Sequence, residues 1–496
     1  MKKLLVIPFL LFSYSLSAQE RTMENYLTAA PFAMPLLQAP SFPIKKFCIS
    51  DFGAVSDGKT LCTQAFSNAI DACVKAGGGT VMVPQGIWLT GPIELKSNVH
   101  LVVEKGGLIQ FTKDRTQYPI IKAGNSTNNY TPASPIYAYD AKNIAITGEG
   151  IIDGAGDSWR PVKKEKTTAQ QWADLLRSGG TVSNDGKIWW PSKEAMNGEA
   201  YLKNTKPKNP EEYIPARDYL RPYMVYFVRC ENILLENITL RNSPKFVFYP
   251  NRCTNLIMKK VNVFNEWWAQ NGDGIDISAC KNVVIYKCNV NAGDDGICMK
   301  SSGGKDYNKA ELENIVIAGC TVLRAHGGFV IGSNTDGGMN NIYVTDCNFL
   351  GTDIGIRVKS NAGRGGLVHN IYVDNITMKN IKNEAILFSS YYEDMPAGKE
   401  LKDPTTAAKD KVPEFTNFYI KNIKCVGAKQ AVNIIGLSEM PVHDIYLENI
   451  SISADKGFIA TEAKNILMKN VEINSSKPLY SATKSSNILL DGKVIF

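Results

Sequence analysis

Eight-residue segments that share one pattern of apolar and polar positions recur in the middle of this chain. They are GDGIDISA from Gly272, DDGICMKS from Asp294, HGGFVIGS from His326 and DIGIRVKS from Asp353, each with Gly in third place and alternating apolar residues after it. Such alternation predicts a buried β-strand. The starts lie 22, 32 and 27 residues apart, and a weaker copy, NEAILFSS, begins at Asn383. Periods in this range predict a solenoid.

An Asn followed by an apolar residue opens further predicted strands. From Asn232 to Asn370 its intervals are 23, 27, 32, 27 and 29 residues, which is too regular for chance recurrence of a common turn residue. An Asn side chain can turn the chain by bonding its own backbone, and Asn residues at one angular position can form an internal ladder. The full set is Asn98, Asn143, Asn232, Asn255, Asn282, Asn314, Asn341, Asn370, Asn417, Asn465 and Asn487.

A helix is predicted at the N-terminal end of the solenoid. Thr63 to Val74 places five apolar side chains on one stripe, and the glycine run from Gly77 to Gly79 ends the pattern. Because a solenoid needs a polar cover over its first open coil, we expect this helix to be the N-terminal cap. The stripe consists of Ala65, Phe66, Ala69, Ile70 and Cys73.

Two segments interrupt the periodic pattern. A polar and aromatic insertion occupies residues 155–222, and a shorter loop occupies residues 391–413. Long loops on a regular scaffold are usually functional, so both are expected to wall the charged face of the solenoid. The tryptophans of the insertion, which can pack or stack on a sugar ring, are Trp159, Trp172, Trp189 and Trp190.

The start of the chain predicts export. Lys2 and Lys3, the apolar run from Leu4 to Leu16 and the small residues before Gln19 form the three parts of a secretory signal, with cleavage near residue 18. A membrane anchor is the weaker alternative, since the apolar run is shorter than the roughly 20 residues of a span. We expect a signal peptide over 1–18, an extended segment over 19–46 and one solenoid domain over 47–496, in a periplasmic or secreted protein.

Net charge indicates which class of partner the chain can bind, and the placement of the cysteines indicates whether they form disulfides. The net charge of +7 falls to +5 without Lys2 and Lys3, which is too small for a nucleic-acid binder and compatible with an anionic substrate. Eleven cysteines would suit disulfides plus one free thiol in an exported protein. Packed free thiols are favoured instead, because six cysteines lie in or beside the repeats, and zinc-type CxxC spacings are absent. These six are Cys230, Cys253, Cys280, Cys288, Cys320 and Cys347.

Stacking the repeats in register predicts a cluster of acidic residues and a histidine. Neighbouring strands lie about 4.8 Å apart, so Asp294 should lie beneath His326 and Asp273 beneath Asp295. Close negative neighbours raise the pKa of one carboxyl group, which can then protonate a glycosidic oxygen while another polarises water. Carboxyl groups one or two coils apart can reach the spacing of about 6.5–9.5 Å that admits this water and inverts the anomeric carbon.

Taken singly, the same residues also fit roles other than catalysis. Asp294-Asp295 alone would suit a turn or a calcium site, and His326 alone a surface residue. Arg357 and Lys359, two apart on a strand, point to the same side and can hold a substrate carboxylate. The coincidence of all these residues in one register favours a catalytic site for an acidic sugar.

The repeats carry motifs that resemble those of glycoside hydrolase family 28, the polygalacturonases. Asn271-Gly272-Asp273 is similar to the family's Asn-Thr-Asp, with Gly in place of Thr, and Gly293-Asp294-Asp295 to its Gly-Asp-Asp. Ala325-His326-Gly327 is similar to its Gly-His-Gly, with Ala in place of the first Gly, and Arg357-Val358-Lys359 to its Arg-Ile-Lys. The resemblance covers roughly Phe52 to the C-terminus, and the four motifs in this order are highly specific.

This resemblance implies the fold and the roles of the acidic residues. The family implies an all-β, right-handed parallel β-helix that hydrolyses pectin with inversion and without metal or cofactor. By the same resemblance Asp294 is the general acid, Asp273 and Asp295 activate water, and His326 tunes the acid.

The resemblance also implies residues that bind the substrate. Asn271, Arg357 and Lys359 would bind galacturonate. A Tyr after the fifth repeat matches the family's binding tyrosine, and Tyr391 and Tyr392 both fit that position.

The repeat HGGFVIGS and the insertion over 155–222 resemble the exo-acting members, whose extra loops close one end of an open groove. We therefore expect a monomeric exo-polygalacturonase that releases single galacturonate units from chain ends and binds no nucleic acid. A rhamnogalacturonan-directed hydrolase and an endo-polygalacturonase are the alternatives within the family. A calcium-dependent pectate lyase and a non-catalytic β-helix adhesin are weaker alternatives.

Overall fold

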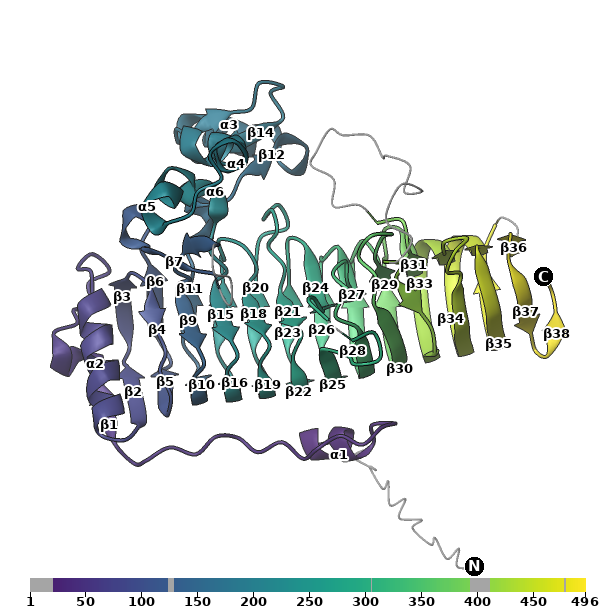
Figure 1. Cartoon of the computed structure of the whole chain (residues 1–496), viewed down its shortest axis with the longest axis horizontal. Helices are drawn as coiled ribbons and strands as arrows, with labels where there is room; N and C mark the ends of the chain where they lie inside the picture. The colour runs from purple at the N-terminus through teal and green to yellow at the C-terminus, as the bar shows by residue number, and fades with distance from the viewer. Residues whose placement is uncertain (1–20, 124–128, 305, 393–410, 477–478) are drawn as a thin grey trace, which may run out of the picture.

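The computed structural model is a long right-handed parallel β-helix with a helix over its N-terminal end, which confirms the predicted fold (Figure 1). It describes residues 21–123, 129–304, 306–392, 411–476 and 479–496. The predicted signal peptide over 1–18 lies outside the described residues, and so does most of the loop predicted over 391–413. None of the helices in the described ranges is long and apolar enough to cross a membrane.

One face of the β-helix, called face A here, carries the repeats. Ile275 aligns with Ile297, Asp295 with Gly327, and Phe329 with Ile356, so the predicted register is confirmed. The strands of face A are β4 (Ile93–Glu94), β9 (Ile136–Tyr139), β15 (Val225–Val228), β18 (Phe248–Asn251), β21 (Ile275–Ser278), β24 (Asp295–Lys300), β27 (Gly327–Ile331), β29 (Ile356–Lys359), β31 (Glu384–Ser389) and β36 (Tyr480–Thr483).

Two further faces complete each coil. Face B consists of β1 (Lys46–Cys48), β2 (Gly79–Val83), β5 (Val99–Val103), β10 (Lys142–Thr147), β16 (Glu231–Glu236), β19 (Thr254–Lys259), β22 (Lys281–Tyr286), β25 (Leu312–Ala318), β32 (Glu414–Phe415) and β37 (Ser486–Leu490). Face C consists of β3 (Gly86–Thr90), β6 (Gly107–Phe111), β11 (Ile151–Asp153), β17 (Thr239–Arg241), β20 (Asn262–Phe264), β23 (Asn289–Asn291) and β26 (Thr321–Leu323).

Toward the C-terminal end, single strands continue around the corner from one face to the next. These are β28 (Met339–Leu350), β30 (Leu367–Lys379), β33 (Phe418–Ile435), β34 (Val442–Thr461) and β35 (Ala463–Asn474). Apart from the small antiparallel sheet of the insertion over 155–222, two short antiparallel pairings lie outside this scheme in the described residues. They are β7 (Ile120–Lys122) with β8 (Tyr130–Pro132) and the end of β37 with β38 (Lys493–Val494).

The interior of the β-helix is one continuous apolar core, because every coil points its alternate residues inward. All eleven cysteines are free thiols and ten of them are buried, which confirms the prediction of packed thiols. Several stack on successive coils, as Cys253 and Cys280 do through a contact of 3.3 Å from the amide of Cys253 to Sγ of Cys280. The thiols therefore act as small apolar core residues.

The predicted asparagine ladder is present where face A turns into face B. From Asn143 to Asn341, each side-chain amide donates to the Asn of the preceding coil at 3.0–3.2 Å. These residues have φ between 54° and 63°, a left-handed conformation that Asn adopts more readily than most residues. At Asn370 the ladder shifts, because its amide donates to Asn340 at 2.9 Å.

Replacing a rung of this ladder is expected to destabilise the fold. Asn282→Ala removes a bond in each direction and forces Ala into φ of about 57°, so a loss of roughly 2 kcal/mol in unfolding free energy is expected. Asn289→Ala is the matched control, since Asn289 makes a similar amide bond to Asn262 at 3.1 Å on face C. Urea unfolding should show a clearly larger loss for Asn282→Ala; equal losses would contradict the role of the backbone conformation.

The predicted capping helix is α2 (Thr63–Lys75), which lies across the first coil (Figure 1). Its buried residues are Ala65, Phe66, Ala69, Ile70 and Cys73, the same five as the predicted stripe. The 3-10 helix η1 (Ile49–Phe52) packs beside it. The cap thus closes the apolar core at its N-terminal end.

The segment predicted as extended over 19–46 begins with a short helix, α1 (Met23–Thr28), where Thr22 and Asn25 form a reciprocal capping box. Residues 21–45, called the strap here, then run back along the outside of face B toward β1 (Figure 1). The ring centres of Phe32 and Tyr372 of β30 lie 6.2 Å apart, and those of Phe42 and His100 of β5 lie 4.9 Å apart. The strap therefore crosses the coils between β5 and β30.

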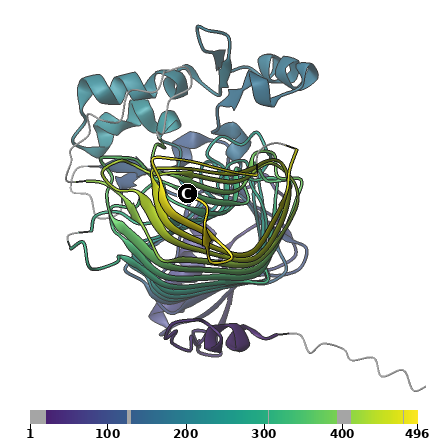
Figure 2. The ribbon, with the colours of Figure 1, turned by 90° about the vertical axis from the view of Figure 1, so that its right-hand side faces the viewer.

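The insertion over 155–222 folds into a small helical module rather than a loop. It stands on the side of the β-helix opposite the strap (Figure 2). Trp159 is buried with its ring 5.0 Å from Tyr118, and Trp189 is buried within the module, so both pack rather than face solvent. The elements are η3 (Gly156–Ser158), β12 (Val162–Lys163), η4 (Lys164–Lys166), α3 (Ala169–Arg177), β13 (Thr181–Val182), β14 (Ile188–Trp190), α4 (Lys193–Thr205), α5 (Pro210–Tyr213), η5 (Ile214–Ala216) and α6 (Arg217–Leu220), while η2 (Arg115–Gln117) lies outside it.

Candidate active site

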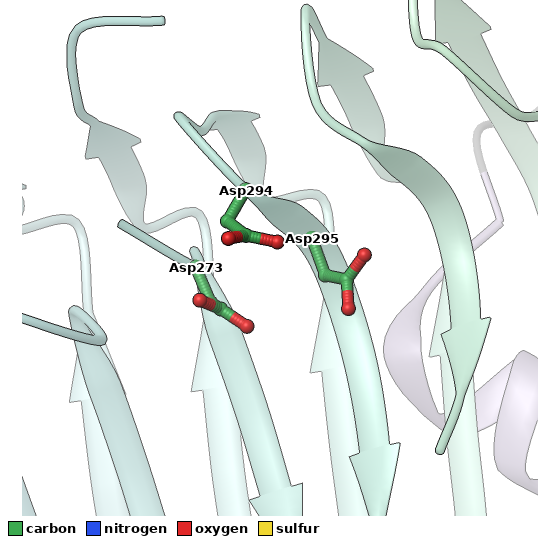
Figure 3. Close-up of side chains that lie close together, drawn as sticks. All are labelled: Asp273, Asp294 and Asp295. Atoms are coloured by element: carbon green, nitrogen blue, oxygen red, sulfur yellow. The ribbon is translucent and has the colours of Figure 1, made fainter. Parts of the chain in front are cut away.

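Three carboxylates converge where β21 and β24 begin (Figure 3). Asp273 precedes β21, Asp294 precedes β24, and Asp295 is the first residue of β24. One oxygen of each carboxylate lies within 4.8 Å of the others. The parallel register aligns Asp273 with Asp295, as the repeats predict. Residues from two coils therefore form one acidic cluster.

The next coil adds the predicted histidine. Nδ1 of His326 lies 3.2 Å from Oδ1 of Asp294, and the two side chains are 34% and 20% exposed. This confirms that Asp294 and His326 lie on adjacent coils and on the same face. Nε2 of His326 lies 3.2 Å from Nζ of Lys166 and 3.7 Å from Oδ2 of Asp353.

The two predicted cations both contact Asp295. Nζ of Lys359 lies 2.7 Å from Oδ2 of Asp295, and Nη1 of Arg357 lies 3.2 Å from Oδ1. The Lys359 side chain is only 5% exposed and that of Arg357 is 15% exposed. Nε of Arg357 is buried without a hydrogen-bond partner among the described residues. The partly exposed Arg357 side chain can therefore contact a ligand, whereas the nearly inaccessible Lys359 side chain contacts Asp295.

The remaining predicted binding residues lie at the two sides of this cluster. The Tyr392 ring lies 5.3 Å from Cζ of Arg357 and 4.6 Å from Nζ of Lys359. Tyr391 is 38% exposed. Oδ1 of Asn271 accepts a hydrogen bond of 2.9 Å from Arg221 of the insertion. Tyr392 is therefore placed beside Arg357, where its ring can face a ligand bound by that residue.

Burial and neighbouring charges separate the pKa values of the three carboxyl groups. Burial and the charges of Asp276 and Asp294 raise the pKa of Asp273 well above its usual range. Burial also opposes the charge of Asp295, but Lys359 and Arg357 outweigh it and hold its pKa below the usual range. Burial is also the largest influence on Asp294 and opposes its charge, but the hydrogen bond from His326 and the charges of His326 and Lys359 together lower its pKa. The sequence predicted that one carboxyl group of the cluster would have a raised pKa, and in this structure that group is Asp273.

Asp276 and Lys300 belong to the site but were not singled out in the sequence. Nζ of Lys300 lies 3.0 Å from Oδ1 of Asp276 and 3.8 Å from Oδ2 of Asp273. Burial raises the pKa of Asp276 to about 6, although Lys300 opposes that change. The repeat pattern held the signal, since Lys300 occupies the same place in its repeat as Lys359, and Asp276 the same place as Arg357.

The insertion contributes a second group of residues that the periodic pattern could not indicate. Nζ of Lys166 lies 5.7 Å from the centre of the Trp267 ring, beside His326. Lys166, Trp267, His326, Asp353 and Lys382 line a pocket of about 410 Å³ on this side of the carboxylates.

A larger pocket of about 700 Å³ lies on the N-terminal side of Asp273. The rings of Tyr226 and Tyr249 stack there at 5.5 Å on successive coils of face A. Burial lowers the pKa of Lys245 to about 8 and that of Arg221 to about 10. The insertion lines the pocket with Leu202, Lys206, Pro207, Lys208, Tyr213, Leu220 and Arg221. The tyrosine rings can pack against a sugar ring, and the neighbouring cations can bind the carboxylate of an acidic sugar.

The carboxylate cluster was also considered as a metal site. Asp273, Asp294 and Asp295 lie close enough together to ligate one cation. However, Lys359 and Arg357 already contact Asp295, and Lys300 faces Asp273, so protein cations compensate much of the charge that a divalent ion would need. That the site works without metal stays a prediction.

Comparison with known proteins gives a consistent family. The sequence model of glycosyl hydrolases family 28 matches residues 173–477, more than half of the chain. A probable polygalacturonase of Vitis vinifera is 29% identical over 67% of this chain, which spans 60% of that protein. An exo-poly-alpha-D-galacturonosidase of Dickeya chrysanthemi is 28% identical over 95% of this chain and 77% of its own length.

Both modes of attack occur among similar proteins. An endo-polygalacturonase of Pectobacterium carotovorum is 24% identical over 82% of this chain and 87% of its own length. The crystal structure of a hyperthermoactive exopolygalacturonase from Thermotoga maritima matches with a TM-score of 0.66 and 27% identity, covering 92% of this chain and 94% of that one. The comparisons therefore agree on the fold and the family and leave the mode of attack open.

Proposed function

This chain belongs to glycosyl hydrolases family 28 and is a glycoside hydrolase of the polygalacturonase type, and from that premise we propose that it removes galacturonate from chain ends of pectin by hydrolysis. The observation that carries the exo mode is the pocket of about 700 Å³ beside Asp273, part of whose wall is the insertion over 155–222. A bare β-helix face is an open trough along which a polymer can be cut internally. A trough that ends in a walled pocket favours a chain end.

The geometry supports a division of roles among the carboxyl groups. Asp294 protonates the glycosidic oxygen as the C1–O bond breaks, because it is the most exposed of the three and contacts His326. A water oxygen bonds to C1, and its proton passes to the ionised Asp295. Asp295 is ionised at the start, since Lys359 and Arg357 hold its pKa low.

Arg357 links substrate binding to this chemistry. The exposed part of its guanidinium can donate to the uronate carboxylate while Nη1 still donates to Asp295. When the uronate draws part of the guanidinium charge, Asp295 becomes a better base for water. Binding of an acidic sugar to Arg357 would therefore also make Asp295 a stronger base for water.

Inversion is part of the proposal but rests on the family resemblance. The nearest oxygens of the three carboxylates lie within 4.8 Å, closer than the roughly 6.5–9.5 Å between carboxyl groups that usually leaves room for a water. The anomeric form of the first product, observed by proton NMR during hydrolysis, decides the point.

Early digestion of polygalacturonate is expected to release short products, chiefly monomer, while viscosity falls little. The insertion and the pocket beside Asp273 admit a chain end, so each cleavage shortens the polymer only slightly. Reducing ends and viscosity are followed together, and the products are resolved by size. The same digestion in EDTA separates hydrolysis from a calcium-dependent lyase, which would form an unsaturated product only without the chelator.

A deletion provides the matched comparison. Replacing residues 162–216 by a short Gly-Ser linker removes most of the wall while keeping Trp159 and Arg221, and the variant is expected to lower viscosity faster per bond cut. Immediate viscosity collapse with mixed oligomers in the intact enzyme would support endo attack instead. Activity confined to rhamnogalacturonan would support the alternative substrate.

A further inference from the structure

Lys166 brings a positive charge from the insertion to the far side of the catalytic histidine. It ends η4, and its Nζ lies 3.2 Å from Nε2 of His326 and 3.4 Å from the carbonyl oxygen of Gly293. On the opposite side of the ring, Nδ1 lies 3.2 Å from Oδ1 of Asp294. Lys166, His326 and Asp294 thus form a chain of three polar groups.

The chemistry of these groups decides where their protons lie. An ammonium group has three donors and no acceptor, so Nε2 must accept from Lys166. The imidazole is then neutral and carries its hydrogen on Nδ1, from which it donates to Oδ1 of Asp294. An imidazolium would point a second N–H at the ammonium, which places two donors and two positive charges against each other.

The position of one proton follows from this arrangement. The Asp294 and His326 pair can hold it on Oδ2 of Asp294 beside a neutral ring, or on Nε2 of His326 beside a carboxylate. Both forms contain the same number of protons, and only the first can protonate a leaving oxygen. A positive charge at Nε2 favours the first form.

Because of the other charges around His326, the charge of Lys166 determines whether the proton lies on Asp294 or on His326. Asp353 lies 3.7 Å from Nε2 and favours an imidazolium, but Lys382 compensates it through an ion pair of 2.7 Å. Asp294 on the Nδ1 side also favours an imidazolium. Without Lys166, the ring would bridge two carboxylates and take up the proton.

We propose that Lys166 is a positioning residue that donates a hydrogen bond to Nε2 of His326, so that a proton taken up by the Asp294–His326 pair for catalysis lies on Asp294 rather than on His326. This inference rests on the proposed function, in which Asp294 is the general acid. It gives the insertion a second role, because the module that walls the pocket also supplies a charge that prepares the acid. Lys166 contacts the acid only through His326.

The test compares kcat and KM of Lys166→Met and Lys166→Arg on a defined oligogalacturonide. Lys166→Met is expected to lower kcat by about 10- to 100-fold with little change in KM, because proton donation acts in the transition state. Lys166→Arg keeps a donor and a charge and should recover most of the loss. Lys164→Met is the control, since Lys164 lies on the same 3-10 helix, is exposed, and faces Trp172.

Three further measurements separate proton placement from a structural role. On 4-nitrophenyl galacturonide, whose leaving group needs no proton, Lys166→Met should lose less than about threefold. Asp353→Asn in the Lys166→Met background should restore part of kcat, because it removes the carboxylate that would otherwise stabilise the imidazolium. The chain has four histidines, so ¹⁵N-histidine NMR can show the His326 tautomer directly.

Specific results would overturn the proposal. Equal losses on both substrates would show that Lys166 maintains the structure, and a raised KM with unchanged kcat would show that it binds substrate. An Nε2–H tautomer in the wild type would also refute it, whatever the kinetics. If the wild type released no reducing ends from any galacturonan, the proposed function would fail, whereas the NMR result would still be read independently.

Discussion

Asp294→Asn is expected to lower kcat on oligogalacturonides by about 10²- to 10⁴-fold while substrate still binds. The amide has nearly the same shape as the carboxyl group but cannot release a proton to the leaving oxygen. The contact with Nδ1 of His326, now 3.2 Å, can persist because the amide oxygen also accepts a hydrogen bond. Steady-state kinetics gives kcat, and calorimetric titration of the inactive variant gives the binding constant.

A matched control and a contrary result define this test. Asp71→Asn on α2 removes an exposed carboxylate that pairs with Lys96, far from the cluster, and should leave kcat unchanged. Turnover by Asp294→Asn within a few-fold of wild type would show that another group donates the proton. Asp273, whose pKa is raised, would then be the first candidate.

Arg357→Ala and Lys359→Met are expected to fail in different ways, although the sequence suggested one role for both. Arg357→Ala removes the donor available to a uronate, so kcat/KM should fall about 100-fold with much of the loss in KM. Lys359 is buried against Asp295, so Lys359→Met should act on kcat, with KM less affected.

The pH profile provides the sharper distinction. Lys359 and Arg357 hold the pKa of Asp295 low, so removing Lys359 raises that pKa. Asp295 must be ionised to take a proton from water, and a higher pKa means that it loses its charge at a higher pH. The acid side of the profile for Lys359→Met should therefore move to higher pH. Lys424→Met, an exposed change on face C rather than face A, is the control. A wild-type KM in both test variants would remove the support for an anionic substrate.

The periodic part of the molecule could be predicted from the sequence because each coil repeats the same contacts. Gly at the third place and alternating apolar residues set the strand register, and the register alone aligned Asp273 with Asp295 and Asp294 with His326. The same logic would have found Lys300, had the seventh place of every repeat been compared. The asparagine ladder and the capping helix were predictable for the same reason.

The insertion could not be predicted in this way. Lys166 and Arg221 reach the site through the path of a non-periodic module, and their distances to His326 and Asn271 depend on its tertiary packing. Trp267 also lies between repeats, where no neighbour shares its position. The tryptophans of the insertion looked available for sugar stacking, but Trp159 and Trp189 are used as core residues.

The strap has a consequence for how the chain reaches its folded state. Its residues leave the ribosome before the coils that they cover, and Tyr26 packs against Tyr286 and donates to Asp346 at 2.6 Å, some 320 positions later. The surface that receives it does not exist until those coils have been synthesised and stacked. A coil that slipped by one residue would turn the outward apolar residues of face B inward and leave the strap without its binding surface. The strap is thus among the last segments to reach its folded position, and it can bind only to correctly stacked coils.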